Sequence, residues 1–323
     1  MAESRMSRLS NQYHAWTRSH PTAAEDFRTA IEDLLNDAGI IFDRVSTRVK
    51  AWSSLKRKAK KRGEGGDFIY PTPWDDIHDV MGVRVTLYHS TTIPNALDVL
   101  GESFKVVRSV DKAAETRISG GFGYGSHHLV LTVTDDSAAA MEELADFVGW
   151  TFEVQIRTVL QHAWAEFEHD IRYKQGPTPP SPEVDRLFTL AAGLIELADQ
   201  QFDEIAALKA PRTETDTDVE LTPETLPGVL AIILGNRFPL SRSEHYRFLA
   251  EILEENDIRS LDQLEQLLDD DAIAHVHDTM HYRFRPGQVR LIDDLLLNKF
   301  GKQHIEATAE SGDRAGRRRR LHA

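Results

Sequence analysis

The sequence predicts an α+β protein, in which a mixed β-sheet flanked by helices is followed by a smaller all-helical domain. Several short segments alternate apolar and polar residues, and helical patterns separate them. Beyond an acidic segment, Leu, Ile and Phe recur only at helical spacing. With 323 residues, 41% of them hydrophobic, the chain is long enough to form two domains with cores of their own.

The elements of the first domain follow from these patterns in chain order. We expect strands near 41–50, 83–88, 104–111, 128–134 and 150–157. Helices are expected at about 24–38, 53–62, 92–101, 137–147 and 158–174. The helix at 53–62 should begin near Trp52 and Ser53, because serine is a good N-cap. A proline-rich break at 176–182 then precedes a long amphipathic helix over 183–208.

Composition along the chain suggests the domain boundaries. Residues 1–210 should form the sheet domain and fold alone, and residues 211–225, rich in Thr, Asp, Glu and Pro, read as an acidic linker. Residues 226–307 should form the helical domain, whose role the sequence leaves open. The arginine-rich residues 308–323 are expected to be a disordered basic tail.

Charge and composition exclude some classes of protein. A net charge of -14 argues against nonspecific nucleic-acid binding by the whole surface. The absence of cysteine excludes disulfides and thiolate zinc sites. No run approaches 18 apolar residues and the N-terminal segment lacks a hydrophobic stretch, so we expect a cytoplasmic protein without a membrane partner.

Residues 151–158 carry the clearest functional pattern. Glu153, Gln155 and Arg157 share one face of the expected strand, roughly 6.6 to 6.8 Å apart, while the apolar residues between them enter the core. An ordinary amphipathic strand would look the same. A carboxylate, an amide and a guanidinium in a row nevertheless suit a metal ion and phosphates.

Four other segments carry polar residues near the expected strand ends. Arg48 and Lys50 lie on one face of the first strand, and a run of cations continues through residue 62. Such a run is often only a solvated face. Asp79 precedes the second strand, and a glycine-dense loop at 120–128 contains Tyr124, a candidate stacking platform.

Four motifs occur in one order: Arg48-x-Lys50-x-x-x-Ser54-x-x-x-Lys58, Asp79-x-x-Gly82-x-Arg84, Gly123-Tyr124-x-Ser126-x-His128, and Glu153-Val154-Gln155-Ile156-Arg157-Thr158. Their order and spacing resemble the synthetase domain of the RelA/SpoT alarmone enzymes. The sequence departs from the family pattern at Gly125, where Arg is usual, and at His127, where an apolar residue is usual. Both departures concern the acceptor loop.

The resemblance implies a nucleotidyltransferase-like fold and transfer of the β,γ-diphosphate of ATP to the 3′-hydroxyl of GDP or GTP, releasing AMP. It implies that Asp79 and Glu153 are the catalytic residues and hold Mg²⁺, which prefers few carboxylates plus phosphate oxygens. Glu153 is also a candidate base. The residues implied for ATP are Arg48, Lys50, Ser54, Lys58, Lys61 and Arg84. Those implied for the acceptor are Tyr124, His128, Gln155 and Arg157.

Two alternatives remain open at the level of sequence. The chain could belong to a toxic branch that modifies the 3′ end of tRNA or makes adenosine alarmones, with the helical domain as a sensor or fused antitoxin. It could instead be an inactive nucleotide-sensing scaffold, which intact Asp79 and Glu153 disfavour. A homo-oligomer, or a regulatory protein or ligand bound by the helical domain, would be compatible with either function.

Overall fold

The computed structural model describes residues 4–112, 125–174, 181–208 and 220–309, with Ser311, Arg317 and Leu321. The chain forms two compact units. Unit 1 comprises Met1–Ile31, Phe42–Ser90 and Phe104–Gln201, and unit 2 comprises Glu32–Ile41, Thr91–Ser103 and Phe202–Ala323. Unit 2 thus includes two segments, 32–41 and 91–103, that precede the predicted boundary at residue 210.

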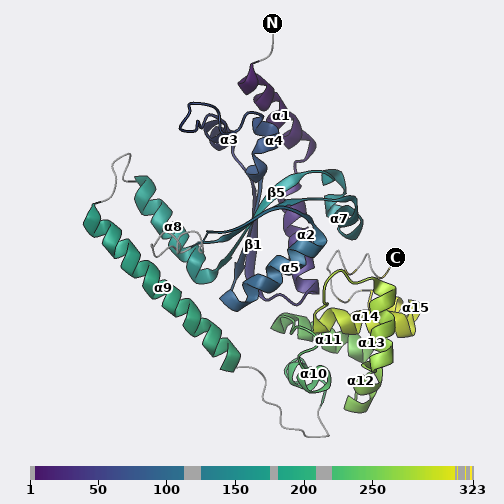
Figure 1. The fold of residues 1–323 in the computed structure, drawn as a ribbon. Helices are drawn as coiled ribbons and strands as arrows, with labels where there is room; N and C mark the ends of the chain where they lie inside the picture. The colour runs from purple at the N-terminus through teal and green to yellow at the C-terminus, as the bar shows by residue number, and fades with distance from the viewer. Residues whose placement is uncertain are drawn as a thin grey trace. The chain divides into compact units, whose positions relative to one another are not determined.

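Unit 1 is built on a five-stranded mixed sheet with the order β1-β2-β5-β4-β3 (Figure 1). The strands are β1 (Phe42–Val49), β2 (Met81–Leu87), β3 (Lys105–Asp111), β4 (His127–Thr132) and β5 (Thr151–Thr158). The central pair β2 and β5 is parallel, and the other neighbouring pairs are antiparallel. The predicted strands and the predicted α+β class are confirmed.

One face of the sheet forms the core of unit 1. Phe152, Val154 and Ile156 of β5 are buried there, as the alternation of the sequence predicts. Helix α2 (Ala23–Asp37) supplies Phe27, whose ring meets Phe152 edge to face with centroids 4.8 Å apart. The polar residues that alternate with these must therefore project from the opposite face.

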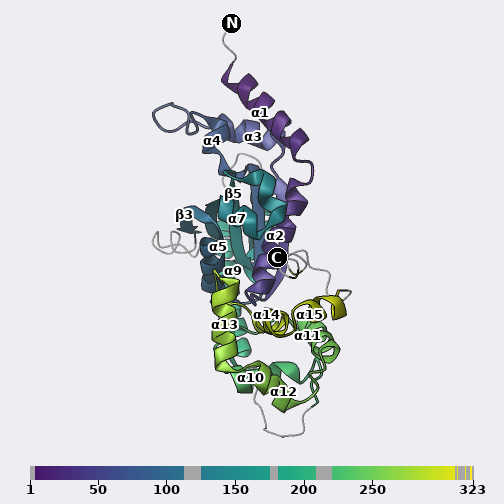
Figure 2. The same ribbon diagram turned by 90° about the vertical axis from the view of Figure 1, so that its right-hand side faces the viewer.

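A small apolar cluster holds the N-terminal helix against the short helices that precede β2. Helix α1 (Arg5–Ser19), which the sequence analysis did not predict, packs with α3 (Trp52–Ala59), α4 (Pro73–Asp76) and the 3₁₀ turn η1 (His78–Val80) (Figure 2). The expected serine cap of α3 is wrong, because Ala51 occupies the N-cap without a side-chain hydrogen bond. A serine cap is present on α1, where the Ser4 side chain accepts a hydrogen bond from the Ser7 N–H.

Of two further helices in the first half, one is divided and the other agrees with prediction. The helix expected at 137–147 is divided into α7 (Asp135–Ala140), capped by Thr134, and η3 (Glu142–Phe147). Helix α5 (Ile93–Ser103) agrees with prediction.

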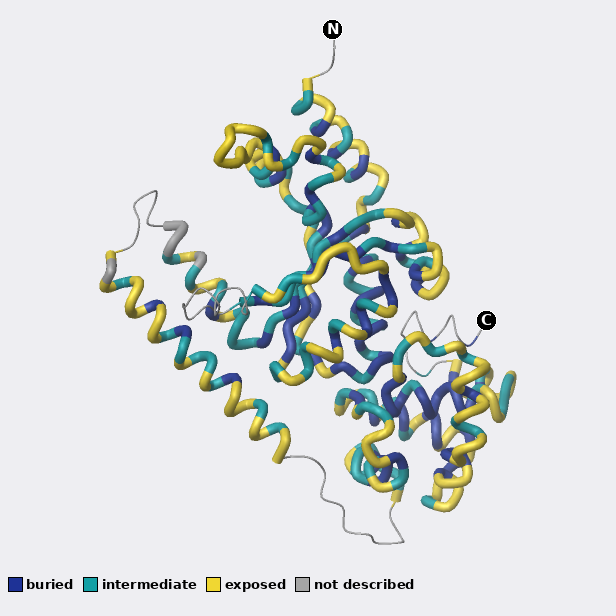
Figure 3. The backbone as a smooth tube through the Cα atoms, viewed as in Figure 1, coloured by how far each residue is buried: buried dark blue, intermediate teal, exposed yellow. Residues whose placement is uncertain are grey.

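Helices α8 (Val159–Lys174) and α9 (Pro182–Leu208) pack together through few residues. Trp164 of α8 is buried against Phe188 and Ala192 of α9. The amphipathic helix expected over 183–208 is covered only in part: Leu187 and Leu194 are 61% and 60% exposed, and exposed segments recur along α9 in Figure 3. Phe167 of α8 is 54% exposed as well.

Unit 2 contains a helical bundle in its C-terminal part, which confirms the predicted all-helical region among the described residues. The helices are α10 (Leu226–Leu234), α11 (Ser243–Glu255), α12 (Leu261–Leu267), α13 (Asp270–Met280), α14 (Gln288–Phe300) and α15 (Lys302–Ala307). Helix α14 lies at the centre of its core and buries Leu291, Ile292 and Leu296 completely. No helix in the described part of the chain is long and apolar enough to cross a membrane.

The described residues of the basic tail correct another expectation. Arg317 is only 2% exposed, and its guanidinium donates to both carboxylate oxygens of buried Asp293 at 2.9 to 3.2 Å. His304 contacts the same carboxylate at 3.1 Å. The prediction of a disordered tail is therefore wrong at Arg317. This residue is ordered because its guanidinium offsets the charge of the buried Asp293 carboxylate.

Candidate active site

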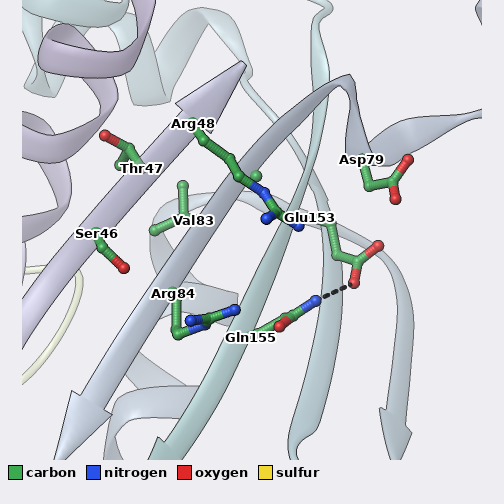
Figure 4. A pocket seen from close by; sticks show the side chains of 9 residues that line it. Ser46, Thr47, Arg48, Asp79, Val83, Arg84, Glu153 and Gln155 are labelled. Carbon is green, nitrogen blue, oxygen red and sulfur yellow. Dashed lines mark hydrogen bonds between the residues drawn. The ribbon is translucent and has the colours of Figure 1, made fainter. Parts of the chain in front are cut away.

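The strand register brings described residues of the sequence motifs toward one pocket. Gly82 of β2 lies opposite Glu153 of β5 on one side and Arg48 of β1 on the other. Arg84 lies opposite Gln155. Because paired residues share a face of the sheet, these side chains project together from the polar face (Figure 4). The pocket has a volume of about 150 Å³ and is lined by Ser46, Thr47, Arg48, Asp79, Gly82, Val83, Arg84, Glu153 and Gln155.

Asp79 anchors the cationic side of the site. Its Oδ2 atom lies 2.9 Å from Nζ of Lys50 and 3.0 Å from Nζ of Lys58. The backbone of Lys50 is fixed as well, since its N–H donates to Val80 at 2.8 Å and its carbonyl accepts from the Tyr13 hydroxyl at 3.0 Å. Oδ1 of Asp79 is buried and has no hydrogen-bond partner among the described residues. A burial cost of this kind is offset when the atom meets a cation.

Glu153 lines the same pocket as Asp79, from strand β5. Its Oε1 atom accepts from Gln155 at 3.1 Å and lies 2.7 Å from Nδ1 of His128, whose Nε2 is 2.6 Å from the Ser126 hydroxyl. With ionised Glu153, the consistent assignment has His128 donating from Nδ1 and Ser126 donating to Nε2. The hydrogen bonds to Glu153 therefore converge on one oxygen and leave Oε2 for a ligand.

The environment keeps Glu153 ionised. Burial raises the pKa of this carboxyl, but the hydrogen bonds from His128 and Gln155, with the positive charge of Lys58, outweigh it and lower the pKa from 4.5 to about 2. Glu153 is therefore an anion throughout the neutral range.

This depressed pKa predicts a pH-dependent stability. A carboxyl whose folded pKa is depressed contributes stability that is fully present above its unfolded pKa and is lost as pH falls through the folded pKa. Compared with Glu153→Gln, the wild-type protein should thus lose stability as the pH falls from about 4.5 to about 2. Urea unfolding of both proteins at intervals across this range measures the difference. A constant difference would contradict the assigned pKa.

Arg84 connects the sheet to helix α8. One terminal nitrogen of its guanidinium donates to Glu166 at 3.0 Å and lies 3.5 Å from Nδ1 of His162, while its buried Nε has no partner among the described residues. Burial, reinforced by the charge of Arg84, lowers the pKa of His162. Burial also lowers the pKa of Arg157, which lies further along β5. His162 and Glu166 of α8 therefore lie next to the pocket, in contact with the Arg84 guanidinium.

The structure gathers most of the predicted site residues but not all of them. Those brought together are Arg48, Lys50, Lys58, Asp79, Arg84, His128, Glu153, Gln155 and Arg157. Ser54 shares a face of α3 with Lys58 and makes no side-chain hydrogen bond to the described residues. Lys61 lies beyond the end of α3 and is exposed. Tyr124 falls outside the described residues, so its predicted role stays a prediction.

The two carboxylates could hold a divalent cation. No group of three potential protein ligands for a metal occurs among the described residues. Mg²⁺ is often held by one or two carboxylates together with substrate phosphates and water. The unpartnered Oδ1 of Asp79 and the remaining oxygen of Glu153 meet that requirement.

Sequence reasoning did not assign roles to Gly82 and Ser126. A Cβ atom at Gly82 would lie 3.8 Å from Cγ of Arg48, an ordinary van der Waals distance, so the Arg48 stem lies beside Gly82 without requiring a glycine there. Ser126 is buried and orients His128. The available signal for Ser126 was its spacing of two residues before His128 at the start of a strand.

Part of the chain that includes this site is similar to known proteins. Residues 47–178 match the model of a region found in RelA / SpoT proteins. The chain is 27% identical over 147 residues to GTP pyrophosphokinase YwaC of Bacillus subtilis, a match that covers 45% of this chain and 65% of that protein. It is also 27% identical over 163 residues to GTP pyrophosphokinase YjbM of the same organism, covering 50% of this chain and 70% of that protein.

Among solved structures, the small alarmone synthetase 1 from Bacillus subtilis resembles this chain with a TM-score of 0.48 and 21% identity. That match covers 61% of this chain and 97% of the other.

Proposed function

We infer the activity of this chain from one premise, that its residues 47–178 form a RelA/SpoT-type synthetase region. The proposed reaction transfers the β,γ-diphosphate of ATP to the 3′-hydroxyl of GDP or GTP. The bond from the β-phosphorus to the oxygen that bridges it to the α-phosphate is broken, and a bond from the 3′-oxygen to the β-phosphorus forms. The 3′-hydroxyl proton is released to solvent, and the bridging oxygen leaves with AMP. The product is guanosine tetraphosphate or pentaphosphate.

The pairing of Asp79 with Lys50 and Lys58, in one pocket with Glu153, is the observation that supports this reaction most strongly. Each lysine lies within 3.0 Å of the Asp79 carboxylate, so the two ammonium groups are held close together before any phosphate arrives. Phosphoryl transfer depends mainly on positioning and on neutralising phosphate charge. Two pre-positioned cations therefore suit the triphosphate of the donor.

Asp79 and Glu153 are the proposed ligands of a divalent cation. When bound, the cation would neutralise charge on the transferred diphosphate and on the leaving AMP. Glu153 is better suited to this role than to that of a base, because a general base works best with a pKa near the operating pH and its own pKa is about 2. His128 and Gln155 orient the carboxylate from one side.

Arg48, Arg84 and Arg157 are the proposed contacts to the nucleotides. Arg84 is held by Glu166, the Arg48 stem lies beside Gly82, and both arginines line the pocket. Guanidinium planes stack on bases and also bind phosphate in two-pronged fashion. The pocket of about 150 Å³ is smaller than the roughly 300 to 1,000 Å³ of common ligand sites, so the substrates must extend beyond it.

The acceptor is tested by offering several nucleotides to the same protein. ATP labelled on its β-phosphate is incubated with GDP, GTP, ATP or bulk tRNA in turn, at saturating Mg²⁺. Labelled guanosine product only with GDP or GTP is the expected result. Transfer to tRNA or to adenosine nucleotides alone would favour the toxic branch, for which the glycine at position 125 leaves room. No transfer to any acceptor would contradict the proposal.

A further inference from the structure

Unit 2 contains a second pocket whose size suits a small molecule. Its volume is about 700 Å³, within the range of roughly 300 to 1,000 Å³ that ligand sites usually occupy. It is lined by Glu102 at the end of α5, by residues 236–238 after α10, by Ile273 and His277 of α13, and by residues 282–286 before α14. None of these residues takes part in the candidate active site.

The lining of this pocket is cationic although the chain as a whole is strongly acidic. Arg237, Arg283, Arg285 and His277 line it, against one carboxylate from Glu102. Arg237 is already paired with Asp270 at 2.6 Å. Arg283 and Arg285 are exposed, and within the described ranges no carboxylate lies within 4.0 Å of either. In a protein with a net charge of -14, two arginines left without such a partner are available for an external anion.

The segment that carries these two arginines is rigidly held. Arg290 lies against the rings of Tyr282 and Phe284, 5.1 and 5.5 Å from their centroids, and the Tyr282 hydroxyl donates to Asp294 at 2.7 Å. Immediately after the segment, the Gly287 N–H donates to the Asp37 carbonyl at 2.8 Å. Arg283 and Arg285 therefore project from an ordered backbone, which lowers the entropy cost of binding a ligand.

The aromatic residues of the pocket add a second kind of contact. Phe238, Tyr282 and Phe284 line it beside the arginines. Aromatic rings suit the planar base of a nucleotide, and arginine forks suit phosphate oxygens. A bare phosphate ion would fill only a small part of the volume.

We propose that this pocket of unit 2 binds a small phosphorylated ligand of nucleotide size, through Arg283 and Arg285. The site is separate from the proposed synthetase chemistry, and the inference does not depend on that chemistry. It assigns a ligand class to the helical region, whose role the sequence alone left open.

Isothermal titration of the full chain with GTP and with inorganic triphosphate, in magnesium-free buffer, tests the proposal. The double variant Arg283→Ala/Arg285→Ala should lose one binding site or bind it at least tenfold more weakly. Arg247→Ala removes an exposed arginine of α11 that does not line the pocket, and it should bind like the wild type. The single variant Arg285→Gln provides the same test if the double variant does not fold.

The outcomes are distinct. Unchanged binding by a folded pocket variant would overturn the proposal, as would an equal loss in Arg247→Ala, because the latter indicates nonspecific attraction. Tighter binding of GTP than of triphosphate at the site lost in the double variant identifies a nucleotide ligand, and equal affinity identifies the phosphates as the recognised group. Since the titration measures binding, an inactive synthetase would not affect its result.

Discussion

Asp79→Asn and Glu153→Gln are each expected to reduce pyrophosphoryl transfer by roughly a hundredfold or more. A bound divalent cation supplies several kcal/mol of charge stabilisation, and each 1.36 kcal/mol changes the rate about tenfold. Both substitutions keep the shape of the side chain, and both residues line the polar pocket, Asp79 from the turn η1 and Glu153 from β5. Far-UV circular dichroism should therefore be unchanged, and initial rates at saturating Mg²⁺ measure the loss.

Asp75→Asn is the matched control for the first of these variants. Asp75 is exposed and lies four residues before Asp79 in the same stretch of chain. Removing its charge changes the local electrostatics without touching Lys50 or Lys58. Wild-type rates are expected for the control. Rates above about a tenth of wild type in both site variants would remove Asp79 and Glu153 from the metal-ligand role.

Gly39→Ala should destabilise unit 2 by about 2 to 5 kcal/mol. Gly39 ends helix α2 with a φ of +69°, which costs other residues about 1 to 2 kcal/mol. A Cβ atom there would also lie 2.8 Å from the carbonyl oxygen of Leu240 and 3.1 Å from Cα of Gly287. Both neighbours are backbone atoms, so the contact cannot be relieved by turning a side chain, and overpacking costs about 1 to 3 kcal/mol more.

Gly149→Ala separates the cost of the positive φ from the cost of overpacking. Gly149 has a φ of +81° but nothing within 4 Å of its added Cβ, so only the backbone conformation is penalised. Thermal unfolding of the full chain should show the larger loss for Gly39→Ala. Equal losses in the two variants would show that residue 39 does not pack closely against Leu240 and Gly287.

Contacts of Asp37, at the end of helix α2, explain why the domain boundary was hard to predict from the sequence. Composition marks residues 211–225 as a linker, yet it cannot reveal that Asp37 accepts a hydrogen bond from Gly287 and pairs with Arg290 at 3.0 Å. These partners lie some 250 positions apart in the chain. A fragment ending at residue 210 would lose them, so we now expect it to be less stable than the sequence suggested.

The sheet and much of the active site were predictable for a simple physical reason. Strand alternation reports burial directly, so Glu153, Gln155 and Arg157 could be placed on one face. Contacts between elements are not encoded in any local period. The Arg84 to Glu166 pair and the small buried contact of α8 with α9 depend on how helices dock. Helix α1, in contrast, buries Leu9, Tyr13 and Trp16 at helical spacing, a local signal that the sequence reasoning overlooked.

The most direct test of the proposed chemistry is to identify the products formed from ATP and GDP. Phosphorus-31 NMR and chromatography of a complete reaction should show AMP and guanosine tetraphosphate in equal amounts, with the new diphosphate on the 3′-oxygen. The Asp79→Asn protein should form neither. ADP with inorganic phosphate, or AMP with free pyrophosphate and unchanged GDP, would show that the site hydrolyses ATP and does not transfer its diphosphate to the acceptor.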